Sequence, residues 1–148
     1  MDKEIYELEA NIIGAMILSH AKFQDAQDLG LEPEEFESVA YGKAYTTMLD
    51  LRASDMVTLR NNVKDDILFD EIKYAATYCI SPAGFDGWIK QMKYKTANNK
   101  LLKLSKQIPE IVESKTTIEE KIDQVNQSLI DNKIIKNIGT PKPVADIL

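Results

Sequence analysis

Apolar residues recur at helical spacing along most of the chain. Over residues 4–19 they return every three or four positions, and acidic residues occupy the first turns, where they suit the helix dipole. The same spacing covers residues 33–51, which open with a proline turn, and residues 72–79, while Thr58 is a candidate cap for a short helix between them. Only DMVTL and DILF are ambiguous between helix and strand. The sequence therefore predicts an all-α fold that begins with a compact helical head over residues 1–80.

A long helix is predicted to follow the head. Ser81 as N-cap and Pro82 at the first helical position mark its start, and no strong breaker appears before Pro109. A continuous helix of this length would extend about 40 Å at 1.5 Å per residue. Its apolar stripe consists of Phe85, Trp88, Ile89, Met92, Leu101, Leu104 and Ile108.

A second long helix follows a short connection. Thr117 and Glu120 form a capping-box pattern, and the helix predicted after them covers TIEEKIDQVNQSLIDNKIIKNIG. Its apolar residues are spaced for a single partner helix: Ile118, Ile122, Val125 and Leu129. Asn132 continues this seam, either as a polar residue that sets the register or as part of a frayed helix end. The two helices are predicted to form an antiparallel hairpin over residues 81–137.

Two paired helices cannot bury all of their own apolar surface. Several residues are left over and are expected to form a second interface with another copy or another domain, namely Trp88, Met92, Ile130, Ile134 and Ile135. The segment 138–148 contains a glycine and two prolines, after which a new apolar pattern starts. We interpret it as a joint and the beginning of a linker helix, whose apolar residues are Val144, Ile147 and Leu148.

Composition is that of an ordinary soluble globular protein. Apolar residues make up 44% and charged residues 28% of the 148 positions, so one domain, or one with an appendage, can bury a core without disulfides. The only cysteine, Cys79, has no disulfide partner within the chain. No signal peptide and no apolar run of bilayer length is evident, so a reducing cytosol is the expected location.

Charge divides the chain into an acidic part and a mildly basic part. Residues 1–85 contain 7 Lys and Arg against 16 Asp and Glu, a net charge of −9, whereas residues 86–137 contain 10 against 7, a net of +3. An acidic head repels nucleic acid, and +3 is far below the basic stripe that phosphate binding needs. Lysines do interleave with Trp88 and Tyr94 on the first long helix, a pattern also suited to single strands, but a solvated helix face is the favoured interpretation. Protein partners are therefore expected.

The residues of enzymes and metal sites do not converge anywhere in the sequence. His20 is the only histidine and is expected at a helix end or on the surface, and Cys79 lies on an apolar face, where a buried thiol without a histidine partner is inert. The acidic EPEEFE segment fits a solvated loop better than a rigid coordination sphere. YGKAY lacks the upstream glycine and the following Ser or Thr of a phosphate loop. No catalytic residue, cofactor site or metal site is predicted.

Five stretches, in their order along nearly the whole chain, carry a resemblance to a known family. One of them, DMVTL, is an approximate match to an Asp-containing apolar pair before Thr-Leu. ELEANIIGAMILS is similar to the opening helix of that family, and PEEFESVAYGKAYTTMLDL to the segment that leads into its second major helix. CISPAGFDGWIKQMKYKTANNKLLKL is similar to its hairpin helix, and PKPVADIL to the entry of its linker helix. Together they resemble the N-terminal domain of DnaB-type replicative DNA helicases. The compressed region at residues 65–74 differs from common bacterial members and suggests a phage-encoded or divergent one.

The resemblance implies a non-catalytic collar domain of a hexameric helicase in DNA replication. Such domains pair through their hairpins, as a dimer or a trimer of dimers, and contact primase and a helicase loader, with DNA bound only through the full-length ring. ATP and Mg would belong to a RecA-like motor domain after Leu148, so this chain is expected to hydrolyse no ATP. The expected location is the cytoplasm of a bacterial cell or of a phage-infected host. The residues expected in the hairpin seam and dimer interface are Trp88, Met92, Leu101, Leu104, Ile108, Ile118, Ile122, Val125, Leu129 and Ile134.

Two alternative functions remain open at the level of sequence. One is a stand-alone phage or plasmid protein that mimics this domain and binds a host helicase or primase as a loader or an inhibitor. The other is a small helical protein that binds nucleic acid through the lysines of the first long helix. The reading frame beyond Leu148 distinguishes the first alternative from the helicase domain, and salt-dependent binding to single strands would indicate the second.

Overall fold

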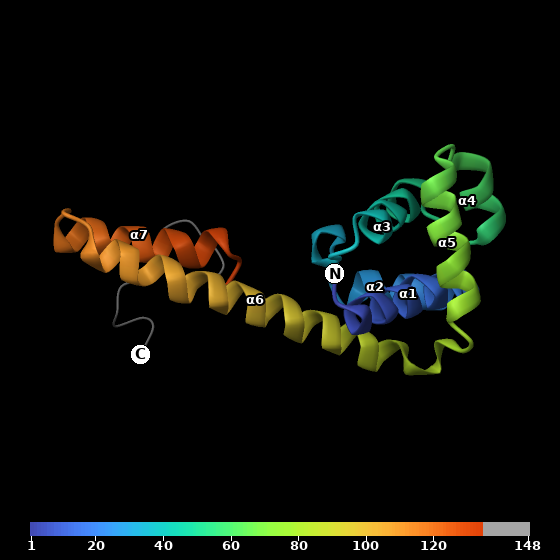
Figure 1. The fold of residues 1–148 in the computed structure, drawn as a ribbon, viewed down its shortest axis with the longest axis horizontal. Coiled ribbons are helices and arrows are strands. Elements are labelled where there is room, and N and C mark those ends of the chain that lie inside the picture. The colour runs from blue at the N-terminus through green and yellow to red at the C-terminus, as the bar shows by residue number, and fades with distance from the viewer. Residues whose placement is uncertain (135–148) are drawn as a thin grey trace. The chain divides into compact units, whose positions relative to one another are not determined.

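The computed structural model describes residues 1–134, which form seven α-helices and two short 3₁₀ turns and contain no strand (Figure 1). The elements in chain order are α1 (Lys3–Leu18), α2 (His20–Asp28), η1 (Pro33–Glu35), α3 (Val39–Leu51), α4 (Met56–Asn62), α5 (Asp66–Tyr78), η2 (Pro82–Gly84), α6 (Phe85–Glu113) and α7 (Ile118–Asp131). The all-α prediction is confirmed. The chain divides into two compact units, Met1–Tyr94 and Lys95–Leu148, and each is described by itself.

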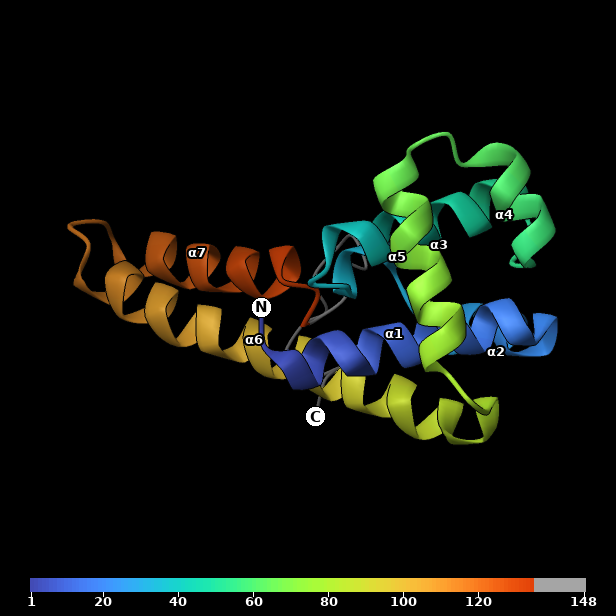
Figure 2. The same cartoon turned by 45° about the vertical axis from the view of Figure 1, so that its right-hand side comes forward.

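Helix α1 supplies a large part of the core of the first unit. Its apolar positions from Ala10 to Met16 are fully buried, and Asp2 caps its N-terminus by accepting hydrogen bonds from the next turn. Helix α5 crosses the C-terminal half of α1, as Figure 2 shows. The crossing is close because Gly14 has no side chain: a Cβ there would lie 2.2 Å from the carbonyl oxygen of Ala75 and 2.5 Å from the Cβ of Cys79.

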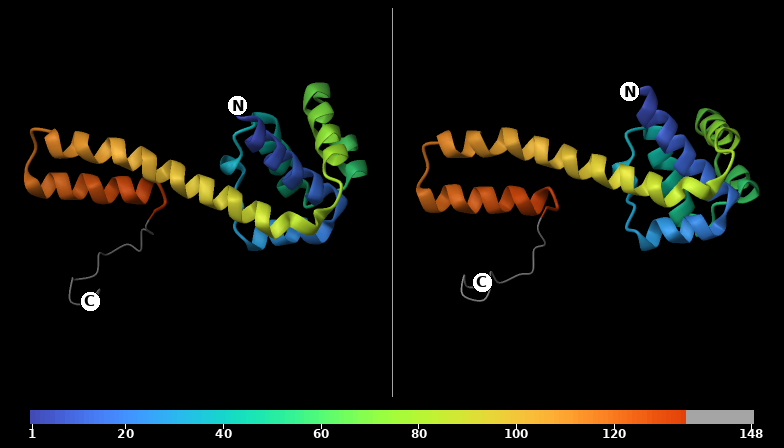
Figure 3. Two further views of the ribbon diagram at one scale, coloured as in Figure 1. Left: turned by 60° about the horizontal axis from the view of Figure 1, so that its bottom comes forward. Right: turned by 90° about the horizontal axis from the view of Figure 1, so that it is seen from below.

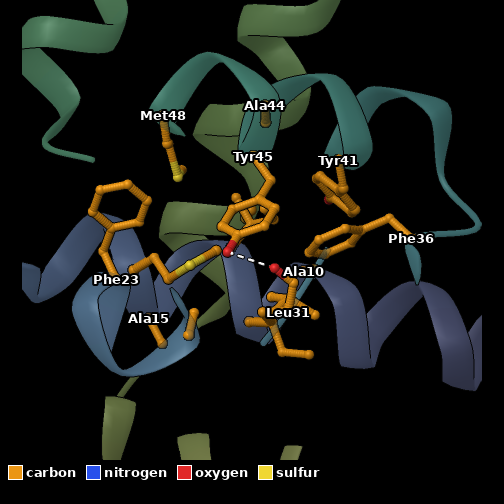
Figure 4. Packing of buried hydrophobic residues seen from close by; sticks show 14 of the residues in the cluster. Ala10, Ala15, Phe23, Leu31, Phe36, Tyr41, Ala44, Tyr45 and Met48 are labelled. Carbon is orange, nitrogen blue, oxygen red and sulfur yellow. Dashed lines mark hydrogen bonds between the residues drawn. The ribbon is translucent and has the colours of Figure 1, made fainter. Parts of the chain in front are cut away.

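Aromatic residues of α2, α3 and the loop between them fill the remaining core (Figure 4). The Phe23 ring packs edge-on against Tyr45 at 6.4 Å, and Phe36 lies 5.7 Å from Tyr45 on its other side. The buried Tyr45 hydroxyl donates to the backbone oxygen of Leu31 at 2.9 Å, so the phenol keeps a partner inside the core. Burial, reinforced by Glu32 and Glu35, raises the pKa of Tyr45 to about 12.

A buried carboxylate joins α1 to the start of α3. Glu9 is fully buried, and its side chain accepts hydrogen bonds from the backbone N–H groups of Glu37 at 2.8 Å and Ser38 at 2.9 Å. Ser38 in turn caps α3 by accepting from the N–H of Tyr41 at 3.2 Å. The Glu9 carboxylate of α1 therefore fixes the backbone just before α3 begins.

In the head, one helix was missed, one predicted cap is wrong and one ambiguity is resolved. Residues 20–28 form helix α2, which was not expected, because only Phe23 and Ala26 of this short segment are buried. The cap of α4 is Asp55 and not Thr58; the Asp55 carboxylate accepts from the N–H of Thr58 at 3.0 Å and from its hydroxyl at 2.9 Å. The ambiguous DMVTL and DILF stretches both lie in helices, or begin them.

The first turns of α6 belong to the head, which was predicted to end at residue 80. Ser81 was predicted to cap the long helix, but it caps the η2 turn, and α6 begins only at Phe85. The buried residues of these turns belong to the same core cluster as α1 and α3, and they are Phe85, Ile89 and Met92. Lys93 fixes the last of these turns, since its ammonium group donates to the Gly30 carbonyl oxygen and pairs with Glu35 at 3.0 Å. The compact unit accordingly extends to Tyr94.

Both helices of the second unit end at residues other than those predicted. Helix α6 continues through Pro109 to Glu113, because Pro109 is exposed and water can satisfy the carbonyl group that its missing N–H leaves without a donor. Thr117 caps α7 by accepting from the N–H of Glu120 at 3.2 Å, as predicted. Helix α7 ends at Asp131, earlier than expected, and Asn132 is its C-cap. The predicted joint and linker, with Val144, Ile147 and Leu148, lie outside the described residues.

The close crossing of α1 and α5 can be tested with a pair of glycine substitutions. We expect Gly14→Ala to lower the free energy of unfolding by roughly 1–3 kcal/mol, because the new methyl group forces the two backbones apart. Gly87→Ala is the matched control: no atom lies within 4 Å of a Cβ there, so helix propensity should leave stability unchanged or raise it by up to about 1 kcal/mol. Urea denaturation monitored by circular dichroism measures both, and equal stability of the two variants would contradict the close approach.

The Glu9 link should matter for the stability of the head. Glu9→Ala leaves two backbone N–H groups without their acceptor, so we expect a loss of roughly 2–4 kcal/mol in the free energy of unfolding. Glu4→Ala removes an exposed carboxylate of the same helix and should cost no more than about 0.5 kcal/mol. Thermal and urea denaturation of both variants is the measurement. Similar losses in the two variants would show that Glu9 acts only through the helix dipole.

Candidate oligomerisation surface

Helices α6 and α7 of the second unit run antiparallel and side by side, which both panels of Figure 3 show. Two polar contacts fix their pairing. The Lys121 ammonium group of α7 donates to the backbone oxygen of Val112 at 2.7 Å, and the Asn132 amide lies 3.4 Å from the side-chain oxygen of Gln107. Asn132 also donates to the Ser128 carbonyl oxygen at 2.7 Å. It thus ends α7 and contacts α6 at once, and a side chain that is 7% exposed and hydrogen-bonded does not belong to a frayed end.

Within the hairpin, burial is concentrated on a narrow face of each helix. Leu104 of α6 is only 4% exposed, and Ile108 and Ile111 are half-buried one and two turns further on. On α7, Val125 and Leu129 are half-buried, as the predicted seam requires. Polar side chains share this face of α7, since Lys121 and Ser128 are half-buried and Asn132 is only 7% exposed. The contact between the two helices is therefore partly polar.

The predicted seam of α7 is buried over only part of its length. Ile118 is 65% exposed and Ile122 is 55% exposed, although both were predicted to lie in the seam. Val125 and Leu129 follow them on the same face of α7 and are half-buried, so burial of the seam is confined to the C-terminal half of the helix. These two isoleucines are corrected from seam to surface residues.

The exposed isoleucines line a groove in the hairpin. This hairpin groove has a volume of about 300 Å³, and its lining residues are Val112, Ile118, Lys121, Ile122, Val125 and Asn126. Val112 is exposed on α6, and Leu101 and Leu102 are exposed on the same helix further toward its N-terminus. Four of the six lining residues are aliphatic, so the groove is an apolar strip without an internal partner among the described residues.

Sequence reasoning missed Val112 and Lys121 as members of this surface. Val112 follows Ile108 by four positions and would have extended the apolar stripe of α6, but the predicted helix stopped at Pro109. Lys121 looked like a solvated charge. Its aliphatic chain lines the hairpin groove while its ammonium group reaches the backbone of α6.

The remaining predicted interface residues are distributed over both units. Met92 is fully buried in the core of the head, so it is unavailable for an interface, and this assignment is corrected. Trp88 is half-buried and packs on the same core. Leu101 is exposed in the hairpin unit, and Ile134, at the end of the described chain, is 36% exposed. The structure thus retains Leu101, Ile118, Ile122 and Ile134 as exposed candidates.

The chain contains one cysteine and one histidine, Cys79 and His20. Among residues 1–134, no group of three or more His, Cys, Asp and Glu side chains is arranged to hold a metal ion. Cys79 is buried in the core, and burial raises the pKa of its thiol above the ordinary value, as expected for a structural cysteine. His20 is exposed at the start of α2. None of the described helices has the length and apolar character needed to cross a bilayer.

Comparison with known protein families identifies the family of this chain. Residues 1–93 match the family described as the DnaB-like helicase N terminal domain. The chain belongs to this family. The match covers α1 to α5 and the first turns of α6, which are the elements of the first compact unit. No curated protein matches the chain.

Membership in the DnaB-like family defines the general role of the chain. It is an N-terminal domain of a replication helicase, a part that does not itself catalyse the reaction. The family match ends at residue 93, within α6 of this DnaB-like domain.

The half-buried seam of the hairpin should be required for its folding. Leu129→Asp places a carboxylate against α6, so we expect α7 to detach and helical content to fall. Asp123, already a carboxylate and exposed on α7, shows that an acid away from the contact face is tolerated, and Gln124→Asp is the matched control with unchanged helicity. Far-ultraviolet circular dichroism measures both. Full helicity in Leu129→Asp would contradict the assigned seam.

Proposed function

We propose that this DnaB-like domain assembles helicase subunits by pairing its hairpin with that of a second copy. The observation that carries the proposal is the hairpin groove, where Ile118 and Ile122 are more than half exposed beside Val112. A stable protein pair buries about 800 Å² on each partner, with a well-packed apolar centre and a polar rim. The exposed isoleucines supply such a centre, and the charged residues of α6 and α7 supply the rim.

Charge favours the hairpin over the head as the contact between identical copies. Residues 1–94 contain 9 Lys and Arg against 17 Asp and Glu, a net charge of −8, so two heads repel each other. Residues 95–134 contain 7 Lys against 6 Asp and Glu, a net charge of +1. Two copies of the hairpin therefore meet with little repulsion. A two-fold axis through the groove would place each Ile122 near its counterpart, as an isologous interface requires.

The proposal extends to the complete helicase through the family. The paired domains form a collar of dimers in a hexameric ring, and the collar docks a primase and a helicase loader during DNA replication in the cytoplasm. ATP and Mg bind in a RecA-like motor domain, and DNA is held by the full-length ring. The family membership supports this set of roles, and the near-neutral, apolar hairpin supports the pairing step on which the collar depends.

The pairing is tested by a charge in the hairpin groove. Ile122→Asp buries a carboxylate at the centre of the proposed interface while leaving the α6–α7 seam intact, so the dissociation constant of the dimer should rise by about tenfold or more with unchanged helicity. Gln124→Asp adds the same charge to an exposed position of α7 outside the groove and should dimerise like the unmodified chain. Sedimentation velocity over a concentration series measures all three proteins.

Two results would overturn the pairing. If the unmodified chain sediments as a monomer at all concentrations, the hairpin groove is not an interface between copies. If Ile122→Asp dimerises as tightly as Gln124→Asp, the dimer forms elsewhere.

A further inference from the structure

The head carries a second groove, which is distinct from the hairpin groove. This Trp88 groove is lined by residues of α1, the end of α5, the loop after it and α6: Asn11, Tyr78, Ile80, Ser81 and Trp88. Its volume is about 370 Å³, and all of its residues lie in the first compact unit. Ile80 projects from the loop beside it and is 93% exposed, which is unusual for a large apolar side chain that contacts a groove.

The aromatic walls of the Trp88 groove are held in place by local packing. The Trp88 indole lies flat against Gly84, where a Cβ would come within 2.9 Å of the ring. Tyr78 stacks on Tyr74 with ring centroids 5.8 Å apart and an interplanar angle of 23°. Tyr6 continues this row, 5.8 Å from Tyr74. The groove is thus the end of a fixed aromatic surface and not a gap left by mobile side chains.

Hydrogen-bond donors in the groove lack acceptors. Within residues 1–134, neither the side-chain amide of Asn11 nor the indole N–H of Trp88 has a hydrogen-bond partner. The Ser81 hydroxyl oxygen accepts from the N–H of Ala83, which leaves its own proton to donate. Three hydrogen-bond donors, on α1, on the loop after α5 and on α6, are therefore available to a ligand that presents carbonyl oxygens.

The surrounding charge is negative. Glu7 lies one helical turn before Asn11 on the same face of α1, and burial, together with the Glu7 charge and a hydrogen bond to Glu7, raises the pKa of Tyr78. The whole unit carries a net charge of −8. Binding of a positively charged ligand in this groove is therefore favoured, and the phosphates of nucleic acid or of a membrane surface are repelled.

We propose that the Trp88 groove binds an extended, proline-containing segment of a partner protein that carries Lys or Arg beside its prolines. Polyproline II segments have no internal hydrogen bonds, so their carbonyl groups can accept from Trp88 and Asn11, whereas the carbonyl groups of a bound helix are already paired. Their rings pack flat on Trp and Tyr side chains. The basic residue of the segment lies against Glu7, where it replaces the ammonium group of the exposed Lys3, 3.8 Å from that carboxylate.

The single tryptophan of the chain makes the proposal directly measurable. The probe is a short synthetic peptide that contains the sequence Pro-Lys-Pro twice, titrated into the 148-residue chain while Trp88 fluorescence is recorded. We expect a saturable change in emission that the same peptide with alanines in place of the prolines does not produce. A peptide with glutamates in place of the lysines should bind at least about threefold more weakly, because it meets the acidic rim.

Two exposed isoleucines provide the variant and its control. Ile80→Ser removes an apolar wall of the groove without touching the core and should weaken peptide binding by about fivefold or more. Ile67→Ser changes another exposed isoleucine, 78% exposed on α5, that does not line the groove and should leave binding unchanged. Glu7→Gln should lower both the affinity and its dependence on salt.

The following results would overturn the proposal. One is the absence of saturable fluorescence change with the proline peptide. Another is equal binding by the alanine peptide, or by Ile80→Ser and Ile67→Ser. A third is a change in sedimentation of Ile80→Ser with no change in peptide affinity, which would make the groove a contact between copies. Binding of a single-stranded oligonucleotide that displaces the peptide would assign the groove to nucleic acid.

Discussion

Two antiparallel helices share only one contact face, and apolar residues outside that face remain in water. In this chain the constraint is sharpened because Lys121 and Asn132 occupy part of the contact face of α7. Ile118 and Ile122 remain exposed and line the hairpin groove with Val112. The hairpin therefore keeps apolar surface that is available for association.

The head differs from the hairpin because it encloses a large apolar core within one chain. Close approach at Gly14 brings α5 onto α1, and the Glu9 carboxylate satisfies the backbone where α3 begins. Lys93 holds the first turns of α6 on this unit through Gly30 and Glu35. The surface of the head carries a net negative charge and the Trp88 groove. The head and the hairpin therefore differ in both charge and exposed apolar residues, and this difference suits them to different partners.

Local sequence patterns anticipated the elements better than their ends or neighbours. The opening helix and the Thr117 cap follow from residues close in sequence, and both were predicted correctly, whereas Ser81 caps the η2 turn and not the long helix as predicted. The end of the first long helix was misplaced because an exposed proline destabilises a helix less than a buried one does. Whether Pro109 is exposed depends on the position of α7. Short helix α2 was missed because two apolar residues give too weak a period for detection.

The sequence by itself determined the all-α class, the acidic head, the hairpin and the likeness to DnaB-type domains, because spacing and charge are properties of neighbouring residues. Only the tertiary structure decided which apolar residues are buried and which remain at the surface. Met92 and Trp88 share one stripe, yet Met92 is sealed in the core while Trp88 borders a groove. Burial depends on the rotation of each helix against its neighbours, and that rotation is fixed by contacts between residues far apart in the chain.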